Sequence, residues 1–89
     1  SDLGSWGSLH EIKEKDPENN VIEANVLLYD TSNCLFLADK MDKLIVAQGL
    51  EGYLVADTGD VLLICNKDLE SEFRSMIKDV KSEKGDKYI

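Results

Sequence analysis

Five short apolar runs, spaced almost evenly along the middle of the chain, constrain its fold more than any other feature. They start 8 to 10 residues apart and cover residues 26–29, 34–37, 44–47, 53–56 and 61–65. Runs of four or five residues rich in Val, Ile, Tyr and Phe are typical of β-strands. Each run is too short to bury its own apolar face, so the repeat predicts an array of stacked strands that bury one another.

The predicted strand array occupies residues 20–66, with Val21-Ile22 as a short first strand ahead of the five runs. The runs are continuous rather than alternating, which is typical of strands covered on both faces. We expect the two terminal helices to provide that cover. Thr58-Gly59 predicts a tight hairpin turn, in which Gly59 takes a positive φ.

A helix is predicted before the array. Trp6, Leu9 and Ile12 recur every three residues and form one apolar stripe. Pro17 disfavours helical geometry at the residue before it, so this helix should end by about Lys15.

A second helix is predicted over residues 67–84, capped by Asn66 or Asp68 and terminated at Gly85. Its apolar positions describe one helical face: Leu69, Phe73, Met76, Ile77 and Val80. These patterns together predict a mainly β fold, in which a stacked-strand array is flanked by an N-terminal and a C-terminal α-helix.

The charge balance excludes several classes of partner. The chain has 89 residues, of which 10 are basic and 18 acidic, and its formal net charge is −8. Nucleic-acid binding requires clustered Lys and Arg that replace counterions on the phosphates, so neither nucleic acid nor an anionic membrane is expected as a partner. No apolar run approaches the roughly 20 residues of a transmembrane helix, and the first residues lack the regions of a signal peptide. We therefore expect a single cytoplasmic domain.

The residues with reactive side chains form no catalytic pattern. His10 has no specific nucleophile or orienting carboxylate in the sequence, so it is assigned a structural role. Asp30, Asp57 and Asp60 stand at strand ends, where acidic residues commonly form turns. The residues by themselves predict no catalytic group and no cofactor-binding site.

Both cysteines, Cys34 and Cys65, lie inside apolar strand runs. We expect two buried thiols, because free cysteine packs as a small apolar residue and cytoplasmic thiols stay reduced. A structural zinc site needs four ligands, usually in closely spaced pairs. Two distant cysteines and one distant histidine do not supply them.

The segment Asp2-Leu3-Gly4-Ser5-Trp6, which opens the first helix, is similar to the closing segment of the catalytic domain in bacterial mannose-1-phosphate guanylyltransferases. The likeness extends through residues 9–12 and 21–30 and continues over residues 46–63. In that last part Gly-Leu precedes a β-rich stretch, which ends in Asp57-Thr58-Gly59-Asp60-Val61-Leu62-Leu63. The two motifs occur in the order found in the family, and the resemblance covers most of the chain.

The resemblance implies a piece of a larger enzyme that joins mannose 1-phosphate to GTP and releases pyrophosphate. Residues 1–15 are then the tail of its nucleotide-binding catalytic domain. Residues 16–89 are a C-terminal domain of stacked strands, similar to a short left-handed β-helix. In similar sugar nucleotidyltransferases, the Asp at the position of Asp2 helps to hold the catalytic magnesium. The family's Gly-rich loop, sugar-phosphate segment and first magnesium carboxylate are absent from this sequence.

We therefore expect a non-catalytic assembly domain, which contacts its own catalytic domain and forms a homodimer through the strand array. A single carboxylate cannot assemble a site for phosphoryl transfer between two substrates, so the chain alone is expected to be inactive. Two alternatives stay open. One is a free-standing β-rich interaction module with no enzymatic parent, and the other is the same domain from a transferase that uses another nucleotide or sugar.

Overall fold

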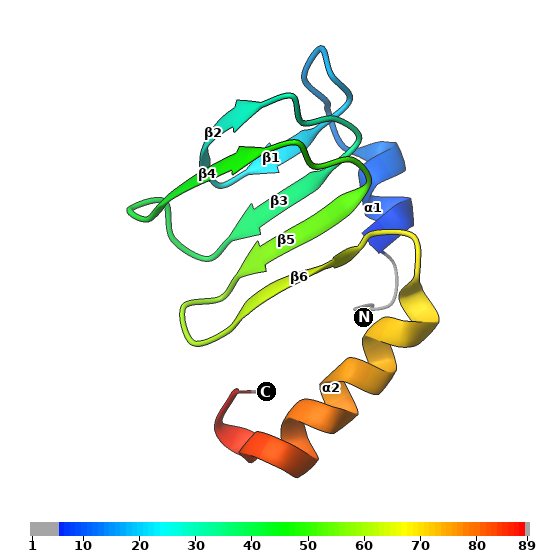
Figure 1. Ribbon diagram of the computed structural model, residues 1–89, viewed down its shortest axis with the longest axis vertical. Helices are drawn as coiled ribbons and strands as arrows, with labels where there is room; N and C mark the ends of the chain where they lie inside the picture. Colours follow the sequence, from blue (N-terminus) through cyan, green and yellow to red (C-terminus); the bar gives the residue numbers. More distant parts are fainter. Residues whose placement is uncertain (1–5, 89) are drawn as a thin grey trace.

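The fold was analysed in a computed structural model, which describes residues 6–88. Short apolar runs form the strands and polar connections separate them, as the sequence predicts (Figure 1). The elements, in chain order, are α1 (Trp6–Ile12), β1 (Val21–Glu23), β2 (Asn25–Tyr29), β3 (Leu35–Ala38), β4 (Leu44–Gln48), β5 (Tyr53–Asp57), β6 (Leu62–Asn66), α2 (Glu70–Lys84) and the 3-10 helix η1 (Asp86–Tyr88).

The strands form two sheets that the chain visits in turn. One sheet has the order β1-β3-β5-β6, and the other pairs β2 with β4. The stacked pairs β1–β3, β3–β5 and β2–β4 are all parallel. Asn25 is in register with Leu44, and Leu35 with Leu54, so corresponding residues of these two pairs lie 19 positions apart. In the β1–β3 pair, Val21 is in register with Leu35, which is 14 positions away. One coil of the repeat therefore contains two strands, one in each sheet. Consecutive apolar runs along the chain lie half a coil apart.

The stacking stops after β5. Instead of a third strand on the β2–β4 sheet, the chain turns back at Thr58-Gly59 and forms β6, which is antiparallel to β5. The hairpin is closed by the Thr58 N–H, which donates to the Val61 carbonyl O at 3.0 Å. Gly59 has φ of 96°, a conformation that residues with a Cβ rarely adopt. The predicted hairpin is confirmed.

Residues with positive φ stack at one corner of successive coils. Asn19, Asn33 and Gly52 have φ of 69°, 58° and 83°. The Asn33 N–H donates to the carbonyl O of Glu18 at 3.1 Å, and the Gly52 N–H donates to that of Ser32 at 3.2 Å. Each coil thus turns at the same place with Asn or Gly, the residues that visit the left-handed region at the lowest cost.

The core has two parts, one on each face of the four-stranded sheet. Between the two sheets lies a cluster of buried side chains: Ala24, Cys34, Phe36 and Val55. On the other face lies a second cluster, against which Leu9 of α1 packs: Val21, Leu35, Leu54 and Ala56. The central strands β3 and β5 are therefore sandwiched, which explains their continuous apolar sequences.

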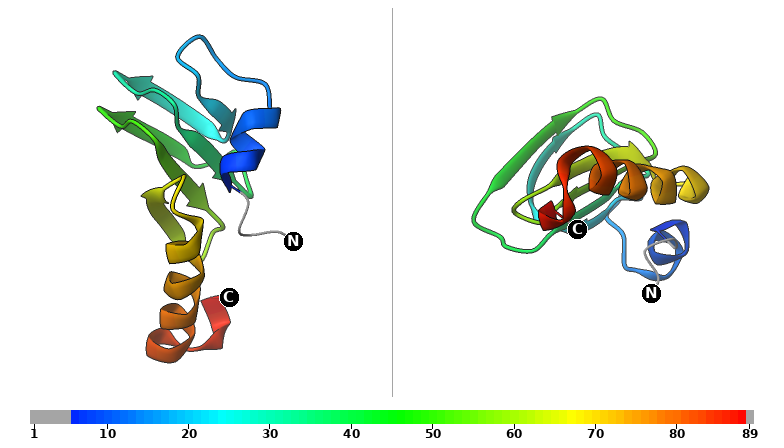
Figure 2. Two further views of the ribbon diagram at one scale, coloured as in Figure 1. Left: turned by 90° about the vertical axis from the view of Figure 1, so that its right-hand side faces the viewer. Right: turned by 90° about the horizontal axis from the view of Figure 1, so that it is seen from below.

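The expectation that the terminal helices cover both faces of every strand is wrong. Exposed and half-buried residues alternate along β2, β4 and β6, because each of these strands has one face in the core and one facing out. In Figure 2, α1 lies on the side of the four-stranded sheet opposite β2 and β4, and α2 leads away from both sheets. Among residues 6–88, no helix lies over the outer face of the β2–β4 sheet.

Both helices differ from prediction in detail. Ile12, expected on the apolar stripe of α1, is 80% exposed, whereas Leu9 packs against the core. The N-cap of α2 is Leu69, without a side-chain cap. The expected cap Asn66 instead accepts a hydrogen bond from the Asp68 N–H at 2.9 Å and so forms a separate turn ahead of the helix. Gly85 ends α2 with φ of 96°, as predicted.

Candidate interaction surface

The histidine and the aspartates of the sequence analysis lie apart from one another. Asp2, the candidate magnesium ligand, lies outside the described residues. His10 is buried, and its Nε2 donates to the carbonyl O of Asn19 at 2.8 Å. This hydrogen bond ties α1 to the loop that leads into β1. Asp30 adopts φ of 47° at the turn that follows β2.

Asp57 is the aspartate with the most contacts in the strand array. It is buried at the end of β5, where its Oδ2 lies 2.9 Å from Nζ of Lys43. Its Oδ1 accepts the N–H of Gly59 at 2.9 Å. The Lys43 ammonium and the Gly59 N–H hold the pKa of this carboxyl below its usual range. Asp57 is thus a turn residue with its charge satisfied, as the sequence predicts.

An open pocket of about 310 Å³ lies between the β5–β6 hairpin and the loop before β4. Asp39, Asp42, Asp57 and Asp60 line it together with two lysines. Within the described ranges, however, His, Cys, Asp and Glu side chains nowhere gather in a group of three that could hold a metal ion.

The two cysteines are free thiols in different surroundings. Cys34 is fully buried between the sheets, where its Sγ accepts the N–H of Tyr53 at 3.4 Å. Cys65 is only partly buried, so the expectation of two buried thiols is right for Cys34 alone. Desolvation raises the pKa of the Cys65 thiol.

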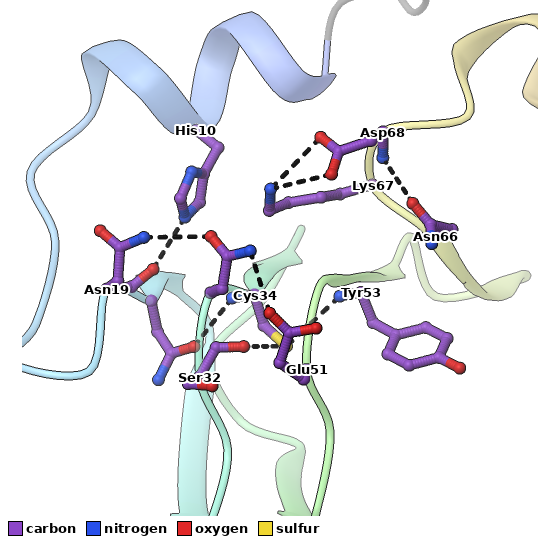
Figure 3. A network of polar contacts seen from close by, with 11 residues as sticks. His10, Asn19, Ser32, Cys34, Glu51, Tyr53, Asn66, Lys67 and Asp68 are labelled. Atoms are coloured by element: carbon purple, nitrogen blue, oxygen red, sulfur yellow. Dashed lines mark hydrogen bonds and ion pairs between the residues drawn. The ribbon is translucent and has the colours of Figure 1, made fainter.

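One buried charged side chain was not identified from the sequence. Lys67 is 6% exposed, its Nζ lies 3.3 Å from Oδ1 of Asp68, and its backbone N–H donates to the Gly52 carbonyl O at 3.0 Å. Figure 3 shows Lys67 and His10 on the side of the coil corners that α1 covers. A lysine that follows a strand ordinarily lies in solvent, so the sequence pattern contains no signal for this burial.

Several exposed apolar residues lie on the outer face of the β2–β4 sheet. Leu27 and Tyr29 of β2 are 47% and 51% exposed, and Leu44 and Val46 of β4 are 52% and 60% exposed. Leu27 is in register with Val46, so these side chains are neighbours on one face. We call these four residues the outer patch. Contiguous apolar patches on a surface commonly mark interaction sites.

A second apolar feature adjoins β4 on its other side. A groove of about 470 Å³ runs along β4 and reaches Leu62 and Ile64 of β6, which are 59% and 55% exposed. Its lining includes the buried side chains of Phe36 and Val55, so the groove opens onto the core between the sheets. We call it the β4 groove. It lies where a third strand of the β2–β4 sheet is absent.

The described residues include no helix that is long and apolar enough to cross a membrane. The sequence of residues 24–80 matches the family described as the MannoseP isomerase/GMP-like beta-helix domain. This match covers more than half of the chain and confirms the resemblance drawn from the two motifs.

Curated relatives that match the chain are named as a putative mannose-1-phosphate guanylyltransferase and as an alginate biosynthesis protein. The chain is 35% identical over 88 residues to the putative mannose-1-phosphate guanylyltransferase of Vibrio cholerae serotype O1, a match that covers 99% of the chain but 18% of the relative. It is 35% identical over 80 residues to the alginate biosynthesis protein AlgA of Pseudomonas aeruginosa, covering 90% of the chain and 16% of that protein. The chain therefore spans less than a fifth of the length of these relatives.

A solved structure has the same fold. It is the crystal structure described as a mannose-1-phosphate geranyltransferase from Thermus thermophilus, which superimposes with a TM-score of 0.74 at 31% sequence identity. The superposition covers 91% of this chain and 24% of the other. The coil architecture is thus shared with a small part of a longer protein.

Proposed function

The chain belongs to the MannoseP isomerase/GMP-like beta-helix domain family, and from this membership we propose that it is the C-terminal domain of a mannose-1-phosphate guanylyltransferase. The parent enzyme transfers GMP from GTP to mannose 1-phosphate and releases pyrophosphate in the cytoplasm. Relatives that carry this name match the chain over almost its whole length. In this proposal residues 1–15 are the tail of the catalytic domain, and residues 16–89 the β-helix domain.

The domain supports assembly rather than chemistry. Guanylyl transfer needs groups that bind two phosphorylated substrates and neutralise the charge that develops between them. The described part of the chain has a net-acidic composition, its most deeply buried aspartate is neutralised by Lys43, and it offers no metal-holding group. Magnesium, GTP and mannose 1-phosphate therefore belong to the catalytic domain, to which this chain contributes at most Asp2.

The observation that carries the assembly role is the distribution of exposed apolar residues. Ile12, on the helix nearest the proposed catalytic domain, is 80% exposed, and the outer patch and the β4 groove are formed by the strands. Figure 2 shows α1 on the side of the four-stranded sheet opposite β2 and β4. Exposed apolar residues on α1 and on the strands fit two separate contacts. One is with the domain's own catalytic partner and the other with a second subunit.

The proposal is tested by calorimetric titration of the 89-residue chain with GTP, magnesium and mannose 1-phosphate, beside an assay of pyrophosphate release by the longer gene product. We expect no heat of binding from the chain and turnover by the longer protein. In-frame coding sequence for a nucleotide-binding domain upstream of Ser1 is the matching genetic observation. Binding of either substrate by the chain itself would contradict an assembly role, and a gene without that upstream sequence would favour a free-standing interaction module.

A further inference from the structure

Helix α1 is anchored to the strands although it is only seven residues long. Its Leu9 packs against the buried cluster on the face of the four-stranded sheet that lies away from β2 and β4. The next residue, His10, is 5% exposed, and its Nε2 donates to the Asn19 carbonyl O at 2.8 Å. Helices of this length are not stable by themselves in water. Contacts with the rest of the chain therefore hold α1 in place.

The connection from α1 to β1 is a closed turn rather than a flexible linker. Oδ1 of Asp16 accepts the N–H of Asn20 at 2.8 Å. Asn20 is 1% exposed, and its own Oδ1 accepts the N–H of Cys34 at 2.9 Å. Asn19, which accepts the hydrogen bond from His10, thus lies between a closed turn and a buried anchor on the strands.

α1 and the strands consequently form one structural unit. Boundaries between domains usually fall in exposed, flexible segments that few contacts cross. A boundary at residue 15 has the opposite character, because the packing of Leu9 and the buried hydrogen bond of His10 cross it. Lys67, which is 6% exposed, lies on the same side of the coil corners as His10 (Figure 3). In the proposed parent, α1 thus belongs to the tail of the catalytic domain by sequence and to the strand domain by packing.

We propose that α1 is a rigid joint through which the strand domain sets the orientation of the catalytic domain of the parent, and that His10 is a positioning residue in this joint. This inference rests on the proposed function and extends the role of the domain from assembly to the geometry of the reaction. The tail of the catalytic domain runs directly into α1, so a displacement of α1 moves that tail. A shift of about 1 Å far from the chemistry can lower a rate about a hundredfold.

His10 supplies the directional contact of the joint. Apolar packing such as that of Leu9 holds α1 on the sheet but does not fix its rotation or its position along the strands. A hydrogen bond from a ring N–H to a carbonyl fixes both a distance and an angle. Because the bond between His10 and Asn19 is largely buried, its removal leaves an acceptor without a partner, which costs more than the loss of an exposed bond.

The test compares two replacements of His10 in the longer gene product. In His10→Gln, the side-chain amide can place an N–H donor at about the position of Nε2, whereas His10→Asn is one methylene shorter and cannot reach Asn19. We expect the α1 amides to exchange hydrogen at least about fivefold faster in His10→Asn, since one buried hydrogen bond is lost. Exchange in His10→Gln should be close to that of the wild type. Circular dichroism should show that the strands stay folded in both variants.

Orientation and catalysis are measured on the same proteins. We expect His10→Asn to lower kcat for pyrophosphate release at least about threefold and to change KM less than about twofold, because the substrates bind within the catalytic domain and only its position is altered. Small-angle X-ray scattering should show a larger radius of gyration for His10→Asn. His10→Gln is expected to restore both values. A merely structural role would leave kcat unchanged at temperatures where both variants are folded.

Lys13→Met is the matched control. Lys13 directly follows α1, and its Nζ lies 2.8 Å from Oε2 of Glu23 on β1, with both side chains well exposed. Exposed ion pairs contribute little, so we expect neither the exchange of the α1 amides nor kcat to change. An effect as large as that of His10→Asn would mean that the hydrogen bond to Asn19 is not what positions the helix, and the proposal would be overturned.

The proposal is also overturned if His10→Asn exchanges and turns over like the wild type, or if His10→Gln fails to restore kcat. Failure of the proposed function is distinguishable from these outcomes. In that case the wild-type longer gene product releases no pyrophosphate, while scattering and hydrogen exchange still report whether His10 fixes the joint.

Discussion

Asp57 and Lys43 illustrate how one residue pair can fix the end of a strand. The Asp57 side chain is 6% exposed, whereas that of Lys43 is 60% exposed, so the aspartate loses most of its hydration and the lysine does not. Ion pairs that include a solvated partner contribute little to stability on average. The Gly59 N–H supplies a second contact, which binds the same carboxylate to the hairpin.

We expect Lys43→Met to raise the pKa of Asp57 toward its ordinary value. Because the folded-state pKa lies below the unfolded one, the contact contributes stability above the unfolded pKa of about 4, and this contribution disappears as the pH falls through the folded-state value. The variant should therefore be less stable than wild type at neutral pH and approach it in acid. NMR titration of the Asp57 carboxyl carbon measures the pKa, and urea denaturation across the same pH range measures stability.

Lys40→Met is the control for that titration. Lys40 lies in the same loop and also lines the pocket beside Asp57, but the ion pair at 2.9 Å is formed by Lys43. A shift of the Asp57 pKa that is equally large in both variants would mean that the general field of the loop, rather than the direct contact, sets the pKa.

Among the secondary-structure elements, the β5–β6 hairpin ends the stacking of coils. Gly59 turns it with φ of 96°, and a Cβ at this position would meet no atom within 4 Å. Gly59→Ala therefore tests backbone conformation alone, without a steric clash. We expect a loss of about 1–2 kcal/mol in the free energy of unfolding, the usual cost of a left-handed non-glycine residue, measured by urea denaturation.

Asp60→Ala, one position further on, is the comparison for the hairpin. Asp60 is exposed, and surface substitutions of this kind usually change stability by about 0.5 kcal/mol or less. If the two variants lost the same amount, the positive φ of Gly59 would not be the reason for the loss.

The molecule as a whole depends for its stability on two core clusters, one of which lies between the two sheets. Phe36 is fully buried there, with 0% exposure. Phe36→Ala is expected to cost about 3–5 kcal/mol, which is a large share of the roughly 5–15 kcal/mol by which small domains are stable. Thermal and urea denaturation should both show the loss.

Tyr29→Ala provides the contrast, because Tyr29 is an aromatic residue of the outer patch with 51% exposure. We expect its loss to be much smaller in the monomer, since only about half of the Tyr29 surface is buried on folding. Equal losses for the two aromatic residues would indicate that the outer patch is covered in solution.

The positions of the strands could be predicted from the amino-acid sequence, because short apolar runs between polar turns leave a chain of this size few other folds. The hairpin at Thr58-Gly59 and the stop at Gly85 also followed from local residue chemistry, whereas the family followed from the resemblance of two motifs to known proteins. All of these depend on residues close together along the chain.

The pairing of runs into sheets could not be predicted in this way, since the parallel registers join residues 14 or 19 positions apart and no local pattern records them. Folding in three dimensions also placed Lys67 under α1 and left Ile12 exposed, although the pattern along the chain favoured neither. The same is true of the open edge of β4. Val46 and Val55 belong to similar apolar runs, yet within residues 6–88 β5 has a strand on each side and β4 on one side. Val55 is buried and Val46 exposed, because burial depends on neighbours that the chain brings together in space.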